Sequence, residues 1–269
     1  MCKIMRKMIT AVLAVVFAVS TGFVIHQFTQ YRAAEGAYEQ AQQLAVHQQS
    51  QAPTVPMELP EVTVPLAVTP TPDENMDAMM ALDIPALQTV NPDVLGWIRI
   101  PDTNIDYPLL QADSNGQYLH TAWDGSDNYA GSIFLECQNS RDLSDFHSLI
   151  YGHNMANGSM FGNLILYSQQ KFRDEHPYVY LNVGGTVYRY EIFAAYTADI
   201  VSNTYRIGFG SSGRKQQAIS YYQEASLISA DRQITPDDRI ITLSTCTGNG
   251  DYDYRWVVQA VLDTSWTAP

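Results

Sequence analysis

The 269-residue sequence contains few cysteines and few basic side chains. Its three cysteines, Cys2, Cys137 and Cys246, are too few for a domain held together by disulfides. Lys and Arg number 15 against 28 Asp and Glu, and three of the basic residues lie in the first 29 positions. The other 240 residues carry 12 basic and 28 acidic side chains, a formal charge of −16. This charge excludes nucleic acid or an anionic lipid surface as a partner bound by charge.

Long apolar runs are also scarce, and the one clear example lies near the N-terminus. Met8–Ile25 is uncharged and about as long as the shortest membrane-spanning helices. Three basic residues precede this run, so the positive-inside rule predicts a cytoplasmic N-terminus and an extracellular C-terminal domain. We therefore expect residues 1–28 to be a cytoplasmic basic tip and a single-pass membrane anchor. A cleaved signal peptide is the alternative, with a weak cleavage site at Ala33–Ala37.

The next segment, residues 29–81, has the composition of an extracellular linker. Residues 29–50 are rich in Ala and Gln, which predicts a helix that continues out of the membrane. Residues 52–72 hold six of the 13 prolines and hardly any charge, which predicts an extended, stiff spacer. We expect a single folded domain over residues 82–269, entered through a short helical segment.

Short apolar and β-branched runs separated by turn residues dominate this domain. Little helix alternates with them, so the sequence predicts a mainly β fold, a closed or nearly closed eight-stranded barrel. Helices are expected near residues 159–170 and 212–229, the second between strands six and seven. The expected strands are residues 95–100, 105–110, 131–136, 147–152, 178–182, 186–196, 239–245 and 255–263.

The last two expected strands contain a candidate thiol nucleophile. Arg239–Cys246 ends in Cys246, and Arg255 opens the next strand after a polar turn. If the two strands form a hairpin, Cys246 and Arg255 lie close together at its base. The arginine can then stabilise a thiolate or an oxyanion. The alternative is an arginine paired with Asp251 or Asp253 on a surface loop.

A cysteine nucleophile also needs a proton carrier, for which histidine is the usual residue. His153 follows a glycine at the end of the apolar run Leu149–Gly152, where its side chain can project from the rim of a strand. Spacing alone does not separate His153 from the three other candidates, His120, His147 and His176. Cys137 is expected at the end of a strand or in the core, although a bridge to Cys246 is formally possible.

Taken together, these motifs resemble the sortase family, specifically class B. The resemblance rests on the strand Thr242–Cys246, on Arg255 and on the upstream Tyr151–Asn154, and it extends over residues 82–269. The helix before the last two strands is a further class B trait. Other matching segments are Gly96–Ile100, Asp106–Leu109, Asn115 with Tyr118 and Leu119, and Gly131–Phe134.

The resemblance implies an eight-stranded sortase-type barrel and a cysteine transpeptidase that needs no cofactor or metal. It makes Cys246 the nucleophile, His153 the general acid and base, and Arg255 the residue that stabilises the oxyanion and positions the substrate. Thr247 departs from the acidic residue sometimes found after the cysteine. Four further residues match positions that line the substrate groove: Asn115, Leu119, Ser244 and Thr245. For the 197–230 region, no motif assigns Tyr205 or Tyr221 to the groove.

The expected partners are secreted proteins with a C-terminal sorting motif, together with a peptidoglycan-precursor or pilin amine as the acceptor. The expected location is the cell membrane of a Gram-positive bacterium. One rival hypothesis is an exported cysteine peptidase or hydrolase that uses the same Cys–His pair, with water as the acceptor. A second is a tethered binding domain without catalysis, which has no need of Cys246, His153 and Arg255 together.

Overall fold

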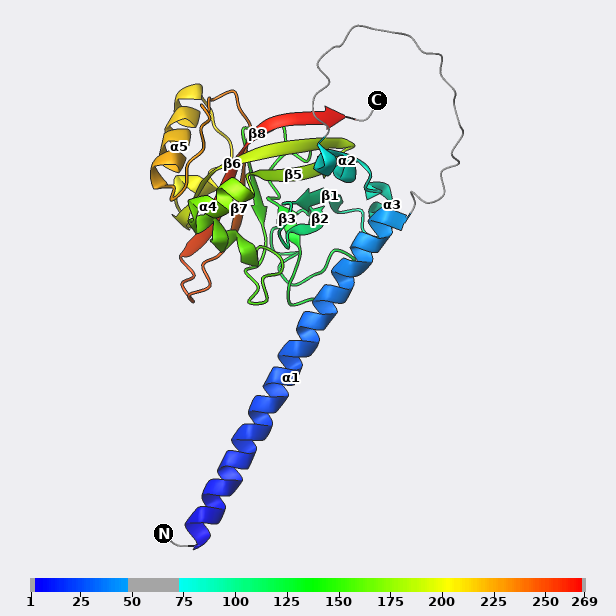
Figure 1. Cartoon of the computed structure of the whole chain (residues 1–269), viewed down its shortest axis with the longest axis vertical. Coiled ribbons are helices and arrows are strands. Elements are labelled where there is room, and N and C mark those ends of the chain that lie inside the picture. Colours follow the sequence, from blue (N-terminus) through cyan, green and yellow to red (C-terminus); the bar gives the residue numbers. More distant parts are fainter. Residues whose placement is uncertain (1–2, 48–72, 268–269) are drawn as a thin grey trace.

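A computed structural model of the chain describes residues 3–47 and 73–267 (Figure 1). The proline-rich part of the expected linker lies outside these residues. The helices are α1 (Lys3–His47), α2 (Glu74–Met80), α3 (Ile84–Val90), the 3₁₀ helix η2 (Gly162–Ser168), α4 (Gln170–Glu175), the 3₁₀ helix η3 (Asn203–Tyr205) and α5 (Ser212–Ala225). The strands are β1 (Val94–Arg99), β2 (Asp106–Leu110), β3 (Ile133–Leu135), β4 (His147–Tyr151), β5 (Tyr178–Val183), β6 (Thr186–Asp199), β7 (Ile240–Cys246) and β8 (Tyr254–Thr267).

The eight strands close into a barrel in the order β1-β2-β3-β4-β7-β8-β6-β5. Two neighbouring pairs, β2 with β3 and β4 with β7, are parallel, and the other pairs are antiparallel. The prediction of a mainly β, eight-stranded closed barrel is therefore confirmed. Because β4 and β7 run in the same direction, their C-terminal ends meet at one edge of the barrel.

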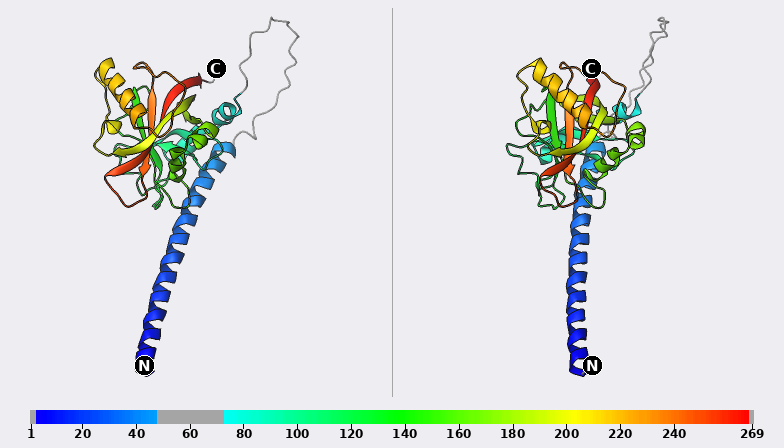
Figure 2. Two further views of the ribbon diagram at one scale, coloured as in Figure 1. Left: turned by 60° about the vertical axis from the view of Figure 1, so that its left-hand side comes forward. Right: turned by 90° about the vertical axis from the view of Figure 1, so that its left-hand side faces the viewer.

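The two faces of β8 show how the sequence pattern builds two cores. Trp256, Val258 and Ala260 point into the barrel, whereas Val257 and Val261 point outward. The outward residues pack in a second apolar cluster with Ile219 and Tyr222 of α5, which covers this side of the barrel in Figure 2. This helix buries the outer face of strands that would otherwise be exposed to water on one side.

The helical prediction for residues 159–170 is only partly right. The chain forms the 3₁₀ helix η2 and then the short α4, with Gln169 between them in an extended conformation. The indole N–H of Trp256 donates to the carbonyl oxygen of Leu164 at 2.7 Å, so β8 fixes the path of this turn. The second predicted helix ends four residues earlier than expected, because Ser226 is extended and its hydroxyl bonds to the backbone of Ile228.

Helix α1 projects away from the barrel but is docked to it at its C-terminal end (Figures 1 and 2). Its 45 residues span about 68 Å at about 1.5 Å per residue. The N-terminal part contains a segment long and apolar enough to cross a membrane, and its side chains are exposed. Four small or aromatic residues spaced three or four apart are buried against the barrel side: Ala34, Tyr38, Ala41 and Ala45.

Polar contacts hold the docked part of α1 in place. The Tyr38 hydroxyl donates to the carbonyl oxygen of Gly131, and its ring packs edge-on against Tyr107 with centroids 5.1 Å apart. The indole N–H of Trp123 donates to the carbonyl oxygen of Ala37 at 2.7 Å. The expected linker helix is thus part of the folded structure as far as residue 45, because barrel residues form hydrogen bonds with one side of it and bury that side.

We expect Tyr38→Ala to lower the unfolding free energy of the full chain in detergent by about 2–4 kcal/mol, because it empties a buried site and removes a buried hydrogen bond. The measurement is thermal or urea unfolding followed by tryptophan fluorescence. Glu39→Ala is the matched control, since Glu39 is on the exposed side of the same turn. Equal melting temperatures for both variants would contradict the docking of α1.

Candidate active site

The hairpin of β7 and β8 brings Cys246 and Arg255 together. The two residues are direct partners in the antiparallel register, as their spacing predicted. The Arg255 Nη1 group donates to the carbonyl oxygens of Tyr252 and Tyr254 at 2.8 and 2.9 Å. Arg255 forms no ion pair with Asp251 or with other acids among residues 3–47 and 73–267. The guanidinium is therefore held by backbone carbonyls, with its Nε and Nη2 donors left for a ligand.

His153 reaches the same edge of the barrel from β4. Tyr151 at the end of β4 pairs with Ser244 in β7, so His153 and Cys246 each lie two residues beyond this pair. The two segments are tied by a hydrogen bond from Gly152 N to Ser244 O at 3.2 Å. The Asn154 side chain adds a second tie, because its Nδ2 donates to the carbonyl oxygen of Cys246 at 2.8 Å.

Glycine at position 152, just before His153, allows a close contact with a buried ring. A Cβ at Gly152 would lie 2.8 Å from the ring of Phe161, which is fully buried, so a larger residue would force the ring or the backbone to shift. The ring of Phe161 therefore packs directly on the backbone at this position. This close contact sets where the chain leaves β4 and hence where His153 projects.

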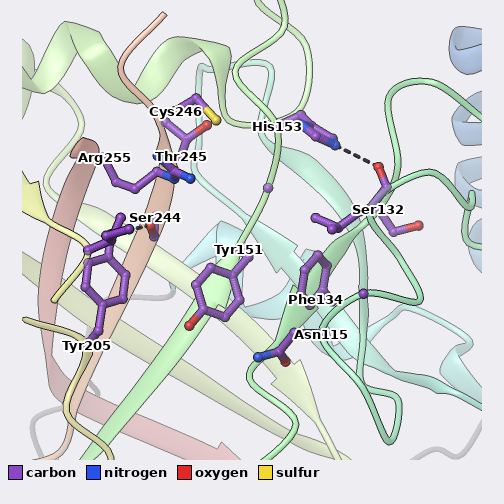
Figure 3. Close-up of a pocket in the computed structure, with 14 residues that line it drawn as sticks. Asn115, Ser132, Phe134, Tyr151, His153, Tyr205, Ser244, Thr245, Cys246 and Arg255 are labelled. Carbon is purple, nitrogen blue, oxygen red and sulfur yellow. Dashed lines mark hydrogen bonds between the residues drawn. The ribbon is translucent and has the colours of Figure 1, made fainter. Parts of the chain in front are cut away.

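A hydrogen bond to a backbone carbonyl fixes the tautomer of His153. Its Nε2 lies 2.7 Å from the carbonyl oxygen of Leu119, which can only accept, so Nε2 carries a proton (Figure 3). In the neutral ring, Nδ1 is then the basic nitrogen. The ring of His120 stacks on His153 with centroids 5.8 Å apart and an interplanar angle of 20°. The loop that contains Leu119 and His120 thus orients the imidazole.

The side chains of Cys246, His153 and Arg255 line one open cavity of about 460 Å³ (Figure 3). Cys246 and His153 lie at one end of the cavity, and Asn115 lies at the other. Its walls combine the ends of β4, β7 and β8 with the loops before β3 and after β6. The lining residues are Asn115, Gly116, Leu119, Ser132, Phe134, Tyr151, Gly152, His153, Ile200, Tyr205, Ser244, Thr245, Cys246 and Arg255.

All four residues expected in the groove from the resemblance line this cavity. Asn115 and Leu119 come from the loop before β3, and Ser244 and Thr245 from β7. The Ser244 hydroxyl lies 2.8 Å from the hydroxyl of Tyr205. The Thr245 hydroxyl is buried without a hydrogen-bond partner among the described residues. Thr245 is thus able to donate a hydrogen bond to a bound molecule.

Sequence reasoning missed several lining residues, and Tyr151 is one that the sequence could have identified. It lies two residues before His153 and therefore projects from the same face of the strand. Tyr205, which the sequence could not assign, lines the cavity, whereas Tyr221 packs against the second core. Burial raises the pKa of Tyr205 to about 12, so its hydroxyl stays protonated at neutral pH. No periodic signal marks Tyr205, because it lies in η3, between two loops.

Cys137, His147 and His176 lie outside the cavity lining, whereas His120 stacks on His153. Among the described residues both Cys137 and Cys246 are free, so the formally possible bridge is not formed. Cys137 lies just after β3, where partial burial and the Glu136 carboxylate raise its pKa. His176 Nδ1 contacts the carbonyl oxygen of Pro101 at 3.2 Å, outside the cavity lining. Residues 3–47 and 73–267 contain no group of three His, Cys, Asp or Glu side chains placed to hold a metal ion.

His147 is buried beneath α5 in its neutral form. Its Nδ1 donates to the carbonyl oxygen of Arg206 at 3.1 Å, and its Nε2 accepts from the Thr242 hydroxyl at 2.6 Å. The Thr242 oxygen in turn accepts from Gln259 at 2.9 Å, which leaves its proton for the histidine. Burial lowers the pKa of His147 to about 4. This residue is structural.

Stability should therefore fall when the pH drops from about 6.5 to about 4. Over this window the unfolded chain binds a proton on His147 that the folded chain excludes, so acid favours unfolding. The full contribution, on the order of 3 kcal/mol, is present above pH 6.5. Urea unfolding at pH 7 and pH 5 checks this expectation. A His147→Gln variant should show a smaller difference between the two pH values, and an unchanged difference would contradict it.

Comparison with known proteins agrees with this fold and site. Residues 98–263 match the sortase domain. The chain is 36% identical over 191 residues to sortase B of Listeria monocytogenes, covering 71% of this chain and 78% of the relative. The chain therefore belongs to the sortase family, whose members are cysteine transpeptidases, and its similarity to sortase B places it in class B.

Solved structures support the same assignment. A Staphylococcus aureus sortase B–substrate complex superimposes with a TM-score of 0.64 and 30% identity, covering 67% of this chain and 84% of that chain. A sortase B complexed with triglycine superimposes with a TM-score of 0.63 and 29% identity, covering 69% and 87%. These structures share the barrel described above.

Proposed function

We propose that this class B sortase cleaves a C-terminal sorting motif of secreted proteins and joins the new C-terminus to a cell-wall or pilin amine. The observation that carries the proposal is the convergence of Cys246, His153 and Arg255 on one open groove. An open groove suits an extended peptide, since both ends of the peptide can leave it. The relatives that bind a substrate and triglycine support a peptide and an amine as the two ligands.

The first half-reaction forms a thioester. The Cys246 thiolate attacks the carbonyl carbon of the scissile peptide bond, and a tetrahedral oxyanion results. Protonated His153 gives its proton to the leaving nitrogen as the carbon–nitrogen bond breaks. The C-terminal fragment leaves as an amine, and the acyl group stays on Cys246.

The second half-reaction transfers the acyl group. An incoming amine attacks the thioester carbonyl, neutral His153 takes the proton from the amine, and the thiolate of Cys246 leaves. The result is a new amide bond and the original enzyme. His153 acts first as acid and then as base, so one imidazole is sufficient for both steps.

Arg255 stabilises the oxyanion in both half-reactions. Its Nη1 is held by two backbone carbonyls, which fixes the other donors before the charge develops. A preorganised donor of this kind contributes about 3 kcal/mol to the transition state. Asn115, Leu119, Ser244 and Thr245 contact the peptide along the groove.

The same proposal includes the location of the enzyme. Residues 1–28 form a cytoplasmic tip and an anchor, residues 29–81 a linker whose helix docks on the barrel between Ala34 and Ala45, and residues 82–269 the extracellular catalytic domain. The apolar part of α1 and its exposed side chains support an anchor in the cell membrane. The basic residues before the anchor support a cytoplasmic N-terminus.

A transpeptidation assay tests this function. The full chain in detergent is mixed with fluorogenic NPxTN- and xPxTG-type peptides, with and without triglycine, and the products are separated by mass. We expect cleavage and a triglycine adduct from the native protein. The Cys246→Ala variant should give neither product, a loss of at least about 1000-fold.

Two other outcomes would overturn the proposal. Hydrolysis that no amine alters would favour the exported peptidase. Cleavage that persists in the Cys246→Ala variant would remove the thiol mechanism. Retained melting temperature in this variant is the control, because Cys246 is partly exposed and its loss empties no core site.

A further inference from the structure

A buried carboxylate lies behind the end of the groove farthest from Cys246. Glu136 follows β3 and is 4% exposed, yet it has no arginine or lysine partner among residues 3–47 and 73–267. It is not itself in the cavity lining. A buried acid without a counter-charge needs a specific set of hydrogen bonds, since burying a charge is otherwise costly.

Two of the groups bonded to Glu136 line the groove. Its Oε2 accepts from Asn115 Nδ2 at 2.6 Å and from the Tyr151 hydroxyl at 2.9 Å. Its Oε1 lies 3.3 Å from Gln138 N and 3.3 Å from the Cys137 thiol. Each oxygen faces an N–H that can only donate, so the carboxylate accepts on both sides.

These contacts fix which way the Asn115 amide points. The nitrogen must face Glu136, because a carboxylate offers no donor, and the oxygen accepts from Cys137 N at 2.9 Å. Each end of the amide therefore has an obligatory partner, and a flipped amide would lose both. The second N–H of Asn115 remains for a ligand, so this residue presents a donor to the groove.

The same carboxylate gives Tyr151 the opposite polarity. Its hydroxyl donates its proton in the hydrogen bond to Glu136, so the lone pairs of its oxygen remain for a ligand. Burial and the charge of Glu136 raise the pKa of Tyr151, which keeps the proton on the oxygen. Tyr151 thus presents an acceptor beside the donor of Asn115.

We propose that Glu136 is a positioning residue that makes this end of the groove a receptor for one amide group of the substrate. The amide oxygen accepts from Asn115 Nδ2, and the amide N–H donates to the Tyr151 oxygen. The inference rests on the proposed function, because it assigns a contact to the substrate of that same groove.

The spacing of the two groups fits one amide. Asn115 Nδ2 and the Tyr151 oxygen contact the same oxygen of Glu136 at 2.6 and 2.9 Å, so they are at most 5.5 Å apart. Hydrogen bonds of about 2.9 Å to the C=O and N–H of a primary carboxamide span such a separation, because the two groups can point to the same side. The C=O and N–H of a trans peptide group point in opposite directions, so their partners would lie farther apart. In Figure 3 the two side chains converge at the end opposite Cys246 and His153, so the amide belongs to a residue at the start of the motif.

The amide is therefore the carboxamide of an Asn or Gln side chain, and binding measurements test this assignment. The protein is the full chain in detergent with Cys246→Ala, which binds without turnover. The probes are a fluorescent Asn-Pro-Gln-Thr-Asn peptide, the same peptide with Leu at its first position, and one with an ester before that position. Fluorescence anisotropy gives the dissociation constants.

We expect the peptide with Leu to bind about tenfold more weakly than the parent peptide, since two neutral hydrogen bonds are lost, and the ester peptide to bind like the parent peptide. Weaker binding of the ester peptide in place of the Leu peptide would contradict the side-chain assignment. Adding Glu136→Gln or Glu136→Met should reduce the ratio of the dissociation constants, Leu peptide over parent peptide, to less than about three. The Gln side chain places an NH₂ donor where Glu136 has one of its two acceptor oxygens. The Met side chain is of similar length and has neither acceptor.

The matched control is Asp145→Asn. Asp145 accepts from Asn139 Nδ2 at 2.8 Å and lies outside the cavity lining. This variant should therefore keep the tenfold ratio between the two dissociation constants. A tenfold ratio of dissociation constants that persists in both Glu136 variants, or a ratio near one in the protein with Glu136 intact, would overturn the inference. Cleavage by the native protein is measured separately, so a failed transpeptidase assay and a failed inference give different results.

Discussion

Replacing Arg255 by alanine should lower kcat for peptide cleavage by about 100- to 1000-fold. The arginine is the direct strand partner of Cys246, and two carbonyls hold its Nη1 in place. Its free donors therefore require no reorganisation when the oxyanion forms. Steady-state kinetics with the fluorogenic peptide measure the effect, and alkylation of Cys246 by iodoacetamide checks that the thiol remains accessible.

Lysine at position 255 distinguishes charge from geometry. One ammonium group cannot both occupy the two carbonyls and reach the oxyanion, so Arg255→Lys should recover only a small part of the lost kcat. Recovery to near the native rate would mean that position 255 supplies charge alone. An unchanged rate in Arg255→Ala would remove Arg255 from the mechanism.

Replacing Gly96 by alanine should destabilise the barrel by at least about 3 kcal/mol. A Cβ at this position would lie 1.9 Å from the carbonyl oxygen of Asn182, a backbone atom of the neighbouring strand β5. Because β1 pairs with both β2 and β5, the clash falls where the barrel closes. The expected fall in melting temperature is about 6–12 °C.

Gly213 provides the control for glycine replacement. It lies in the first turn of α5, where a Cβ would meet no atom within 4 Å. Gly213→Ala should therefore stabilise the protein by about 0.5–1 kcal/mol, since it reduces the freedom of the unfolded chain. If both variants melt like the native protein, the close approach of β1 and β5 at Gly96 is wrong.

Local sequence patterns were sufficient for most of the fold. All eight strands lie where β-branched runs and turn residues predicted them, with ends shifted by a few residues. The prediction for residues 159–170 was the weakest, because the path of that segment depends on Trp256 of β8, which is about 90 residues away. Short helices are often decided by such distant contacts, since they gain little stability alone.

The candidate site was predictable only where its residues are near in sequence. A hairpin with a short turn necessarily brings its two ends together, so the contact between Cys246 and Arg255 followed from their spacing. His153 and His147 end and begin the same apolar run, and nothing local separates them. The resemblance to sortases chose His153, and the barrel explains the difference, because His147 is covered by α5 whereas His153 lies beyond the pair Tyr151–Ser244.

The sequence by itself determined the apolar N-terminal helix, the acidic charge of the remaining chain, the strand pattern and the Cys246–Arg255 hairpin, since each depends on composition or on neighbouring residues. Tertiary structure alone decided the docking of Tyr38 on the barrel and the contacts of Glu136. The partners of Glu136 come from a loop at Asn115 and from the end of β4 at Tyr151. Only the folded barrel brings these segments within hydrogen-bonding distance, and no local pattern specifies which of their side chains meet.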